Sequence, residues 1–184
     1  MGKISESKNV HPFVALLYQK EEYYQKALEK CKHKLGPVLD SSQEYNFSKI
    51  TSYYNSEMGK NLQKRLLVFQ EYQNLEDFHK IKLWSNQVEQ ELSQKRENRK
   101  INIDPGYLGL SKLVLFSTKN YSHRIYINDG IYAEVTLIYE NGGYKAQSWT
   151  YPDYKREATL DFLEESRQKI KQRARNKGYM LDLD

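Results

Sequence analysis

The dipeptide Asp129-Gly130 lies between two segments rich in apolar and β-branched residues, and it constrains the fold more than any other feature of the sequence. Both central positions of a type I′ turn require a positive φ, and Asp-Gly is one of the pairs that tolerate it. We therefore predict a hairpin whose strands are residues 123–128 and 131–139. The two residues that flank the turn face each other, and the rest of the register follows by counting outward.

This register places candidate chemistry on one face of the hairpin. Counting from the turn sets Ile125 opposite Glu134 and His123 opposite Thr136. His123 and Glu134 become diagonal neighbours, about 7–8 Å apart at Cα, so an imidazole and a carboxylate can meet directly or through water. Alternation sends Arg124 to the opposite face. Either a bulge brings Arg124 to the same side, or only one of His123 and Arg124 belongs to the site.

A histidine beside a glutamate is suited to general base catalysis, because the carboxylate orients the imidazole and stabilises its charge. The candidate catalytic residues are therefore His123, Glu134 and Asp104, the last of which precedes Pro105-Gly106. The alternative interpretation is structural. It makes the first two part of a solvated polar sheet face and the third an aspartate that caps its own turn.

Cations and aromatic residues around the hairpin are suited to holding an anion. Arg124 offers a planar fork for bidentate contact with a phosphate or carboxylate. The aromatic segment 149–154 either lines a pocket or packs an edge of the core, and the lysines are otherwise surface charges. The candidate ligand-binding residues are Lys112, Lys119, Arg124, Tyr107 and Asp153.

The first half of the chain alternates short apolar runs with amphipathic helices. Residues 21–35 carry apolar side chains at spacings of three and four and stop at Gly36-Pro37, which predicts a helix. A second helix is expected from Asn74 to about Arg96. Strands are expected at 13–18, 38–47, 65–72 and 101–103, with a polar loop and one helical turn at 48–61. This β-α-β-β-α-β order over residues 1–103 is the pattern of ferredoxin-like folds.

The second half is rich in β-structure. Asp104-Pro105-Gly106 is typical of a turn, and residues 106–112 are compatible with a turn of helix. Further strands are expected at 113–117 and, after a second turn at Asn141-Gly142-Gly143, at 144–149. A last helix is expected at 156–174. We thus expect a single α+β domain over 1–184, divided into the βαββαβ half, a β-rich hairpin or meander with the candidate site at 104–154, and a C-terminal helix and tail at 155–184.

Composition narrows the classes of protein. A chain of 184 residues with 39% hydrophobic and 29% charged residues has the balance of a globular domain. The longest apolar run, residues 13–18, is far shorter than the roughly 20 residues that span a bilayer, so we expect no membrane partner. Residues 1–6 lack the apolar region of a signal peptide. Cys31 is the single cysteine, which favours a reducing cytoplasm.

Motifs for metal and cofactor chemistry are absent from the sequence. The four histidines, His11, His33, His79 and His123, have no metal-ligand spacing, and one cysteine provides no zinc site. Neither the G-x-S-x-G nucleophile elbow nor the dinucleotide fingerprint G-x-G-x-x-G occurs. We therefore expect neither a metal nor a cofactor.

The net charge of +5 permits an anionic partner without demanding one. Basic residues gather near the C-terminus, where they recur at every second position: Arg167, Lys169, Lys171, Arg173, Arg175 and Lys177. On a helix this spacing splits the charges between two sides instead of one stripe. They form either a solvated helix end or a contact for nucleic acid or phosphate.

Several segments of the second half share a pattern with a known family. These are residues 102–108, 111–115, 118–119, 121–126, 130–137 and 149–154, and the segment with Tyr53-Tyr54 and Glu57-Met58-Gly59 is similar too. On these residues the chain resembles a bacterial family known only as domain-of-unknown-function family 4416. Some members carry the label GTP-binding protein, but a P-loop needs G-x-x-x-x-G-K-[ST], and residues 106–112 lack that spacing. The resemblance implies membership of a family but no particular function.

Our leading hypothesis is binding, with or without turnover, of a small anionic ligand such as a phosphorylated metabolite or nucleotide. The site would be a pocket bounded by the ionisable residues between Asp104 and Glu134. A first alternative is an RNA-binding module that uses an exposed sheet face and the basic C-terminal helix. A second is a ligand-free interaction or structural domain in which the same side chains satisfy one another. Whether the protein is an enzyme, and its oligomeric state, stay open.

Overall fold

Strand β1 (Asn9–Tyr18) is the central element of the fold, and its apolar run is almost completely buried. Successive side chains of a strand point to opposite faces of the sheet. Val14 and Leu16 therefore enter one hydrophobic core, whereas Phe13 and Ala15 enter a second core on the other side. The continuous run of apolar residues in the sequence follows from a strand that is covered on both faces.

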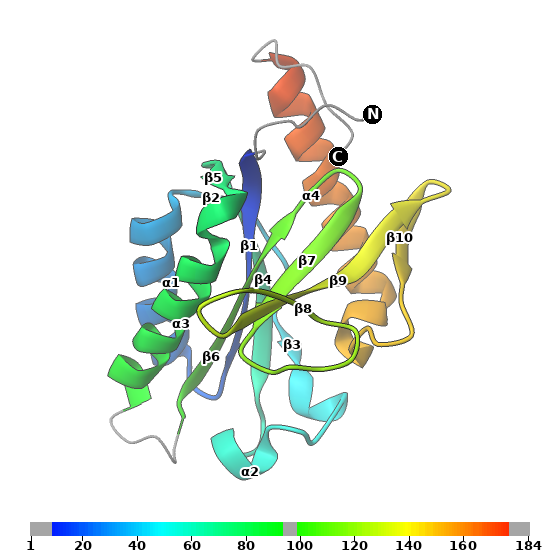
Figure 1. Ribbon diagram of the computed structural model, residues 1–184. Helices are drawn as coiled ribbons and strands as arrows, with labels where there is room; N and C mark the ends of the chain where they lie inside the picture. The colour runs from blue at the N-terminus through cyan, green and yellow to red at the C-terminus, as the bar shows by residue number, and fades with distance from the viewer. Residues whose placement is uncertain (1–8, 94–98, 177–184) are drawn as a thin grey trace.

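The computed structural model describes residues 9–93 and 99–176, and these form three layers (Figure 1). Helices α1 (Glu21–Leu35) and α3 (Phe78–Ser93) cover one face of the sheet. Helix α4 (Glu157–Asn176) covers part of the other face. Within the described ranges, no helix is both long and apolar enough to cross a membrane.

One antiparallel sheet joins the described strands in the order β10-β9-β7-β6-β1-β4-β2, and β3, β5 and β8 add short pairings to β4, β1 and β9. This mixture of helices and antiparallel sheet confirms the predicted α+β class. The strands after β1 are β2 (Val38–Ser41), β3 (Tyr45–Asn46), β4 (Gln63–Phe69), β5 (Gln73–Asn74), β6 (Ile101–Leu108), β7 (Lys112–Ser117), β8 (Ile125–Asn128), β9 (Ile131–Glu140) and β10 (Gly143–Ala146).

The helices follow the sequence pattern closely. The predicted bounds of α1 are confirmed, and Gly36 ends it with a φ of 87°. Asn74 caps a 3-10 turn that leads into α3, and the four-residue helix α2 (Asn55–Met58) is the helical turn expected in the polar loop. The predicted end of α3 near Arg96 lies outside the described residues, as does the N-terminal segment examined for a signal peptide.

The prediction of a turn at Asp104-Pro105-Gly106 was wrong, because this tripeptide lies inside β6 and pairs with β1. The helical turn expected at 106–112 is absent for the same reason. Hydrogen-bonded and non-hydrogen-bonded pairs alternate along an antiparallel ladder. Pro12 has no N–H to donate to β6, which fits a non-hydrogen-bonded pair between Pro12 and Tyr107. Pro105 lies two positions before Tyr107, so its own pair with β1 is of the same kind. The ring nitrogen of Pro105 therefore faces β7.

Pro105 marks the point where β6 and β7 separate. The β6–β7 pairing runs from Gly106 to Leu108 and includes no residue before Gly106. Gly106 itself lies so close to β7 that a Cβ on it would collide with the Val114 carbonyl oxygen and crowd Leu115. Within the described residues, the first half of β6 thus has no strand partner on its β7 side, and this opening positions the site described below.

The hairpin at Asp129-Gly130 is confirmed, with φ values of 49° and 76° at the two turn residues. Asn128 pairs with Ile131 as predicted, but a bulge follows, so that Ile125 pairs with Ala133 and not with Glu134. The predicted pairing of His123 with Thr136 does not form, because β8 begins only at Ile125. The second turn, at Asn141-Gly142, is also confirmed. Strand β10 is shorter than expected and ends at Ala146.

We expect Gly106→Ala to lower the free energy of unfolding by about 1–3 kcal/mol, because the added methyl group meets backbone of β7 that cannot move without breaking the sheet. Urea unfolding would measure the change. Gly143→Ala is the matched control, since the nearest atom is the flexible tip of Lys145 at 4.0 Å; its effect should stay below about 0.5 kcal/mol. Equal effects of the two substitutions would contradict the close approach of β6 and β7.

Candidate functional site

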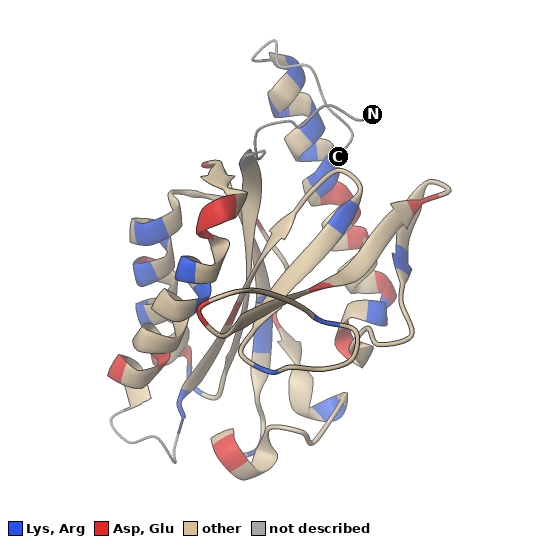
Figure 2. Ribbon diagram, viewed as in Figure 1, with Lys and Arg blue, Asp and Glu red and all other residues tan. Residues whose placement is uncertain are grey.

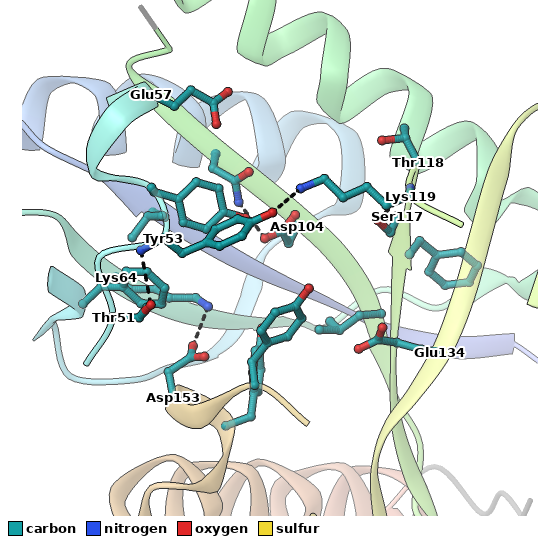
Figure 3. A pocket seen from close by; sticks show the side chains of 18 of the residues that line it. Thr51, Tyr53, Glu57, Lys64, Asp104, Ser117, Thr118, Lys119, Glu134 and Asp153 are labelled. Carbon is teal, nitrogen blue, oxygen red and sulfur yellow. Dashed lines mark hydrogen bonds and ion pairs between the residues drawn. The ribbon is translucent and has the colours of Figure 1, made fainter. Parts of the chain in front are cut away.

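A cavity of about 310 Å³ lies on the α4 side of the sheet, where β6 and β7 have separated (Figure 3). Residues of β6 and β7 line two of its sides. The loop between β3 and β4, which contains α2, the 3-10 turn Pro152–Lys155, the loop after β7 and helix α3 also contribute to the walls. The cavity is therefore built from segments that are far apart in the sequence.

The floor of the cavity is a row of side chains across three neighbouring strands. Lys64 of β4 pairs with Leu17 of β1, and Leu17 pairs with Asn102 of β6. Residues paired in this way project from the same face of a sheet. Asp104 projects from that face too, because it is two residues after Asn102. All four residues line the cavity.

Lys64 and Asp153 form a buried ion pair at one end of this floor. The Lys64 Nζ atom lies 2.6 Å from the Asp153 Oδ2 atom, and both side chains are less than a tenth exposed. The Tyr45 hydroxyl also donates to Asp153 Oδ2, at 3.1 Å. The Lys64 ammonium lies over the ring of Tyr154, 4.7 Å from its centroid. Asp153, a candidate ligand-binding residue, thus has its charge matched by Lys64.

Asp104 is held in its ionised form near the centre of the floor. Its carboxylate accepts a hydrogen bond from the Asn102 amide at 2.6 Å and lies 3.5 Å from the Lys82 ammonium, which reaches it from α3. Burial acts to raise the pKa of Asp104, but the charges of Lys82 and Lys64, together with the Asn102 hydrogen bond, outweigh burial and lower the pKa. Asp104 therefore presents a negative charge to the cavity at neutral pH.

Glu134 of β9 joins the two residues that the hairpin pattern placed on opposite faces. The Arg124 Nε atom donates to Glu134 Oε2 at 2.6 Å, and the His123 Nε2 atom lies 3.0 Å from the same oxygen. The bulge in β8 and the loop before it allow both contacts. The His123 ring stacks on Trp149 at 5.4 Å between centroids. The predicted meeting of an imidazole and a carboxylate is thus present, although His123 is not among the residues that line the cavity.

Arg124 fixes the loop that follows β7. Besides Glu134, its guanidinium donates to the Ser117 hydroxyl, the Lys119 carbonyl oxygen and the Tyr151 hydroxyl at 3.0, 3.0 and 3.2 Å. A guanidinium has five N–H groups, so these contacts leave one of them for a ligand. The structure therefore gives Arg124 a positioning task beside the cavity.

Lys119 and Tyr53 approach each other from opposite sides of the cavity (Figure 3). The Lys119 Nζ atom donates to the Tyr53 hydroxyl oxygen at 2.8 Å. This hydrogen bond lowers the pKa of Tyr53 and raises the pKa of Lys119, because it stabilises a phenolate beside an ammonium. Among residues 9–93 and 99–176, no carboxylate lies within 4 Å of the Lys119 ammonium.

The structure brings together most, but not all, of the candidate site residues. Those that line the cavity are Asp104, Lys119, Arg124, Glu134 and Asp153. Tyr107 does not line it, and its ring packs near the rings of Phe78 and Phe116 in the core. Lys112 lies at the start of β7, at the end opposite the cavity, and pairs with Ile138.

Sequence reasoning missed several residues of the cavity. These are Tyr53, Lys64, Lys82 and Arg99, which come from the first half of the chain or from the loop before β6. Tyr53 had one signal, since it falls in a segment that resembles family 4416. Tyr151 belongs to the aromatic segment for which a pocket wall was one of two interpretations, and it does line the cavity. Lys64 and Lys82 had no signal beyond their positions in a strand and a helix.

Comparison with family models gives one match. The model of a domain of unknown function, DUF4416, matches residues 8–170, which is most of the chain. The protein belongs to the DUF4416 family. No curated protein and no solved structure matches the chain significantly. The DUF4416 match includes every residue that lines the cavity, so the cavity lies within the segment that defines membership.

The buried Glu134 carboxylate should be essential to the site's architecture. We expect Glu134→Gln to lower the free energy of unfolding by about 3 kcal/mol, because it leaves the buried Arg124 guanidinium without its counter-charge. Chemical denaturation would measure the change. Glu91→Gln removes the same charge from an exposed pair with Lys30 and should cost less than about 1 kcal/mol. A loss of similar size in both variants would show that Glu134 is not a buried anchor.

Asp104 should make stability depend on pH in the acid range. Its pKa is lower in the folded protein than in the unfolded chain, so its contribution is present above the unfolded value of about 4 and is lost as the pH falls through the folded value. Asp104→Asn should therefore be less stable than the wild type at pH 7, and the difference should shrink in acid. Melting temperatures between pH 7 and pH 2 would measure it. A difference that is the same at every pH would contradict a lowered pKa.

Proposed function

We propose that the protein binds a small anionic molecule in this cavity, with the Lys119 ammonium as the contact for its negative charge. The observation that carries the proposal is the pairing of charges around the cavity. Lys64 pairs with Asp153, and Lys82 lies 3.5 Å from Asp104. Lys119 has only a tyrosine hydroxyl as its partner in the described part of the chain.

The remaining two cations of the cavity are also matched by acids. Arg99 lies 3.0 Å from both Glu57 and Glu89, and Arg124 lies 2.6 Å from Glu134. A charge that is already paired with a carboxylate gains little from a second anion, because that anion must also overcome the repulsion of the first. An incoming anion is therefore attracted most strongly to Lys119.

The surroundings of Lys119 suit a phosphate or a carboxylate. Hydroxyl groups that line the same cavity can donate to further oxygens of the ligand, and they belong to Thr51, Tyr53, Ser117, Thr118 and Tyr151. Leu17, Phe47 and Phe116 provide an apolar wall for the body of the molecule. A volume of about 310 Å³ is at the lower end for small-molecule sites, which favours a ligand of the size of a phosphorylated metabolite or a small nucleotide.

We also propose that the first half of the chain has a ferredoxin-like arrangement and that the protein is cytoplasmic. The order β6-β1-β4-β2, with helices α1 and α3 on one face, supports a ferredoxin-like arrangement for the first half of the chain. A cytoplasmic location is supported by the single cysteine, Cys31, which is buried and unpaired with another thiol.

The two alternative functions have less support from the contacts. Figure 2 shows basic residues following one another toward the end of α4, but two of them are engaged within the protein. Arg167 donates to the Leu110 carbonyl oxygen at 2.7 Å, and Lys169 pairs with Asp40. This reduces the basic surface that an RNA could contact. A purely structural network would satisfy Lys119 with an acid, and the described residues provide none within 4 Å.

We expect Lys119→Met to weaken the binding of inorganic phosphate, pyrophosphate or a nucleoside monophosphate by at least about tenfold, since a hydrogen bond to a charged group contributes about 1.5–3 kcal/mol. Isothermal titration calorimetry at low salt would measure the affinity. Lys112→Met is the control, because Lys112 is the first residue of β7, the strand that precedes Lys119, and does not line the cavity. Equal weakening by both substitutions, or no binding of any of the three probes to the wild type, would overturn the proposal.

A further inference from the structure

Tyr53 is positioned at the cavity by several contacts. Its ring lies edge to face against Tyr54, with 4.9 Å between centroids and an interplanar angle of 82°. Its backbone N–H donates to the Thr51 hydroxyl at 3.2 Å. The Lys119 ammonium donates to its hydroxyl oxygen and lies 5.1 Å from its ring centroid. The phenol oxygen is thus held at the one cavity cation that, in the described chain, has no carboxylate within 4 Å.

We propose that Tyr53 is the acid–base residue of this cavity and exchanges a proton with a hydroxyl group, or with an activated C–H group, of the bound anion. This inference rests on the proposed anion site, because the ligand must lie beside Lys119. It adds turnover chemistry to binding and assigns that chemistry to a residue outside the His123–Glu134 pair.

The step involves a proton and no other reactant. The phenolate oxygen of Tyr53 forms a bond to the proton, and the O–H or C–H bond of the ligand breaks with its electron pair left on the ligand. The negative charge moves from Tyr53 to the ligand, and the Lys119 ammonium lies beside both. Return of the proton from the phenol to another atom of the ligand completes an isomerisation.

The groups around Tyr53 lower its pKa and so ease the loss of its proton. The hydrogen bond from Lys119 lowers the pKa of Tyr53, and the nearby Tyr121 hydroxyl, from the same loop as Lys119, acts in the same direction. Partial burial and the carboxylate of Glu57 on α2 oppose this, but they do not outweigh the lysine. A pKa below the usual value for tyrosine brings the group closer to the range in which it accepts and returns protons at neutral pH.

Other hydroxyl groups and bases of the site are less suited to this task. Burial raises the pKa of Tyr151, although Arg124 acts to lower it. Burial likewise raises the pKa of Tyr54. His123 contacts Glu134 but does not line the cavity. Among the tyrosines that line the cavity, Tyr53 combines a bonded cation with a lowered pKa.

An arylsulfonyl fluoride tests the inference, because its sulfur reacts with a phenolate and releases fluoride. Tyr126 is an internal standard: it is 57% exposed against 55% for Tyr53, and its ring partner is Tyr132 and not a cation. At pH 7.5, peptide mapping by mass spectrometry should show Tyr53 reacting faster than Tyr126, since a lowered pKa gives Tyr53 a larger ionised fraction. Equal rates for the two tyrosines would overturn the inference.

Variants at Lys119 separate ionisation from simple exposure. Lys119→Met should bring the Tyr53 rate to that of Tyr126, and Lys119→Arg should restore most of it. An unchanged Tyr53 rate in Lys119→Met would count against the pair. Melting temperatures would confirm that each variant is folded, which is expected because Lys119 is exposed.

Tyr53→Phe separates this inference from the proposed binding function. The variant keeps Lys119 and loses one neutral hydrogen bond to the ligand, so phosphate binding should weaken by about fivefold, less than in Lys119→Met. When the absorbance of phenolate is followed as the pH is raised, Tyr53→Phe should lack the earliest ionisation step that the wild type, with its sixteen tyrosines, shows. Intact phosphate binding with no early-ionising tyrosine in the wild type would refute the acid–base role alone. Loss of phosphate binding in Lys119→Met with slow Tyr53 labelling in the wild type would leave only the binding function.

Discussion

The end of the ladder between β6 and β7 is the constraint on which the site depends. A strand inside a sheet normally pairs on both sides, but among the strands that the structure describes, the first half of β6 pairs with β1 alone. Pro105 is compatible with this arrangement, because its missing N–H faces the side where no partner strand follows. Gly106 lets the two strands touch at the last paired position. Beyond that position the strands diverge, and the polar residues Asn102 and Asp104, which project from one face of the sheet, line the cavity at this opening.

The segments around this opening need further contacts to hold them in place, and the buried Glu134–Arg124 ion pair provides them. Glu134 is fixed in β9, which pairs directly with β7. Through Glu134, the Arg124 guanidinium is anchored, and its other donors hold Ser117, the Lys119 backbone and Tyr151. The loop that carries Lys119 is thus tied to both the sheet and the segment before α4. A buried ion pair of this kind stabilises the fold only while both partners are present. Its role is therefore structural, and Arg124 is not the main contact for a ligand.

Local sequence patterns predicted the parts of the structure that local interactions determine. The helix at 21–35 and the hairpin turn at Asp129-Gly130 follow from spacing and turn chemistry. The contact of His123 with Glu134 is present, but it forms through the bulge in β8 and the loop before it and not through the predicted register. The turn predicted at Asp104-Pro105-Gly106 was wrong because these residues belong to a strand that diverges from its neighbour β7, and no local pattern reveals where two strands diverge. The ion pair of Lys64 with Asp153 joins residues 89 apart, and the contact of Lys119 with Tyr53 joins residues 66 apart. Such contacts depend on the completed fold.

The distribution of charge explains why binding would be selective within a cavity that is lined by nine ionisable side chains. Five cations line it, Lys64, Lys82, Arg99, Lys119 and Arg124, and four acids, Glu57, Asp104, Glu134 and Asp153. A ligand that competed for any of the four matched cations would have to break an ion pair that the fold already uses. Lys119 requires no such exchange, since its present partner, Tyr53, is neutral when protonated and shares its hydrogen bond at little cost. The same arrangement links binding with chemistry: an anion that draws the Lys119 ammonium toward itself necessarily changes the stability of the Tyr53 phenolate. In this proposal, recognition of charge at Lys119 and movement of a proton at Tyr53 would both depend on one hydrogen bond.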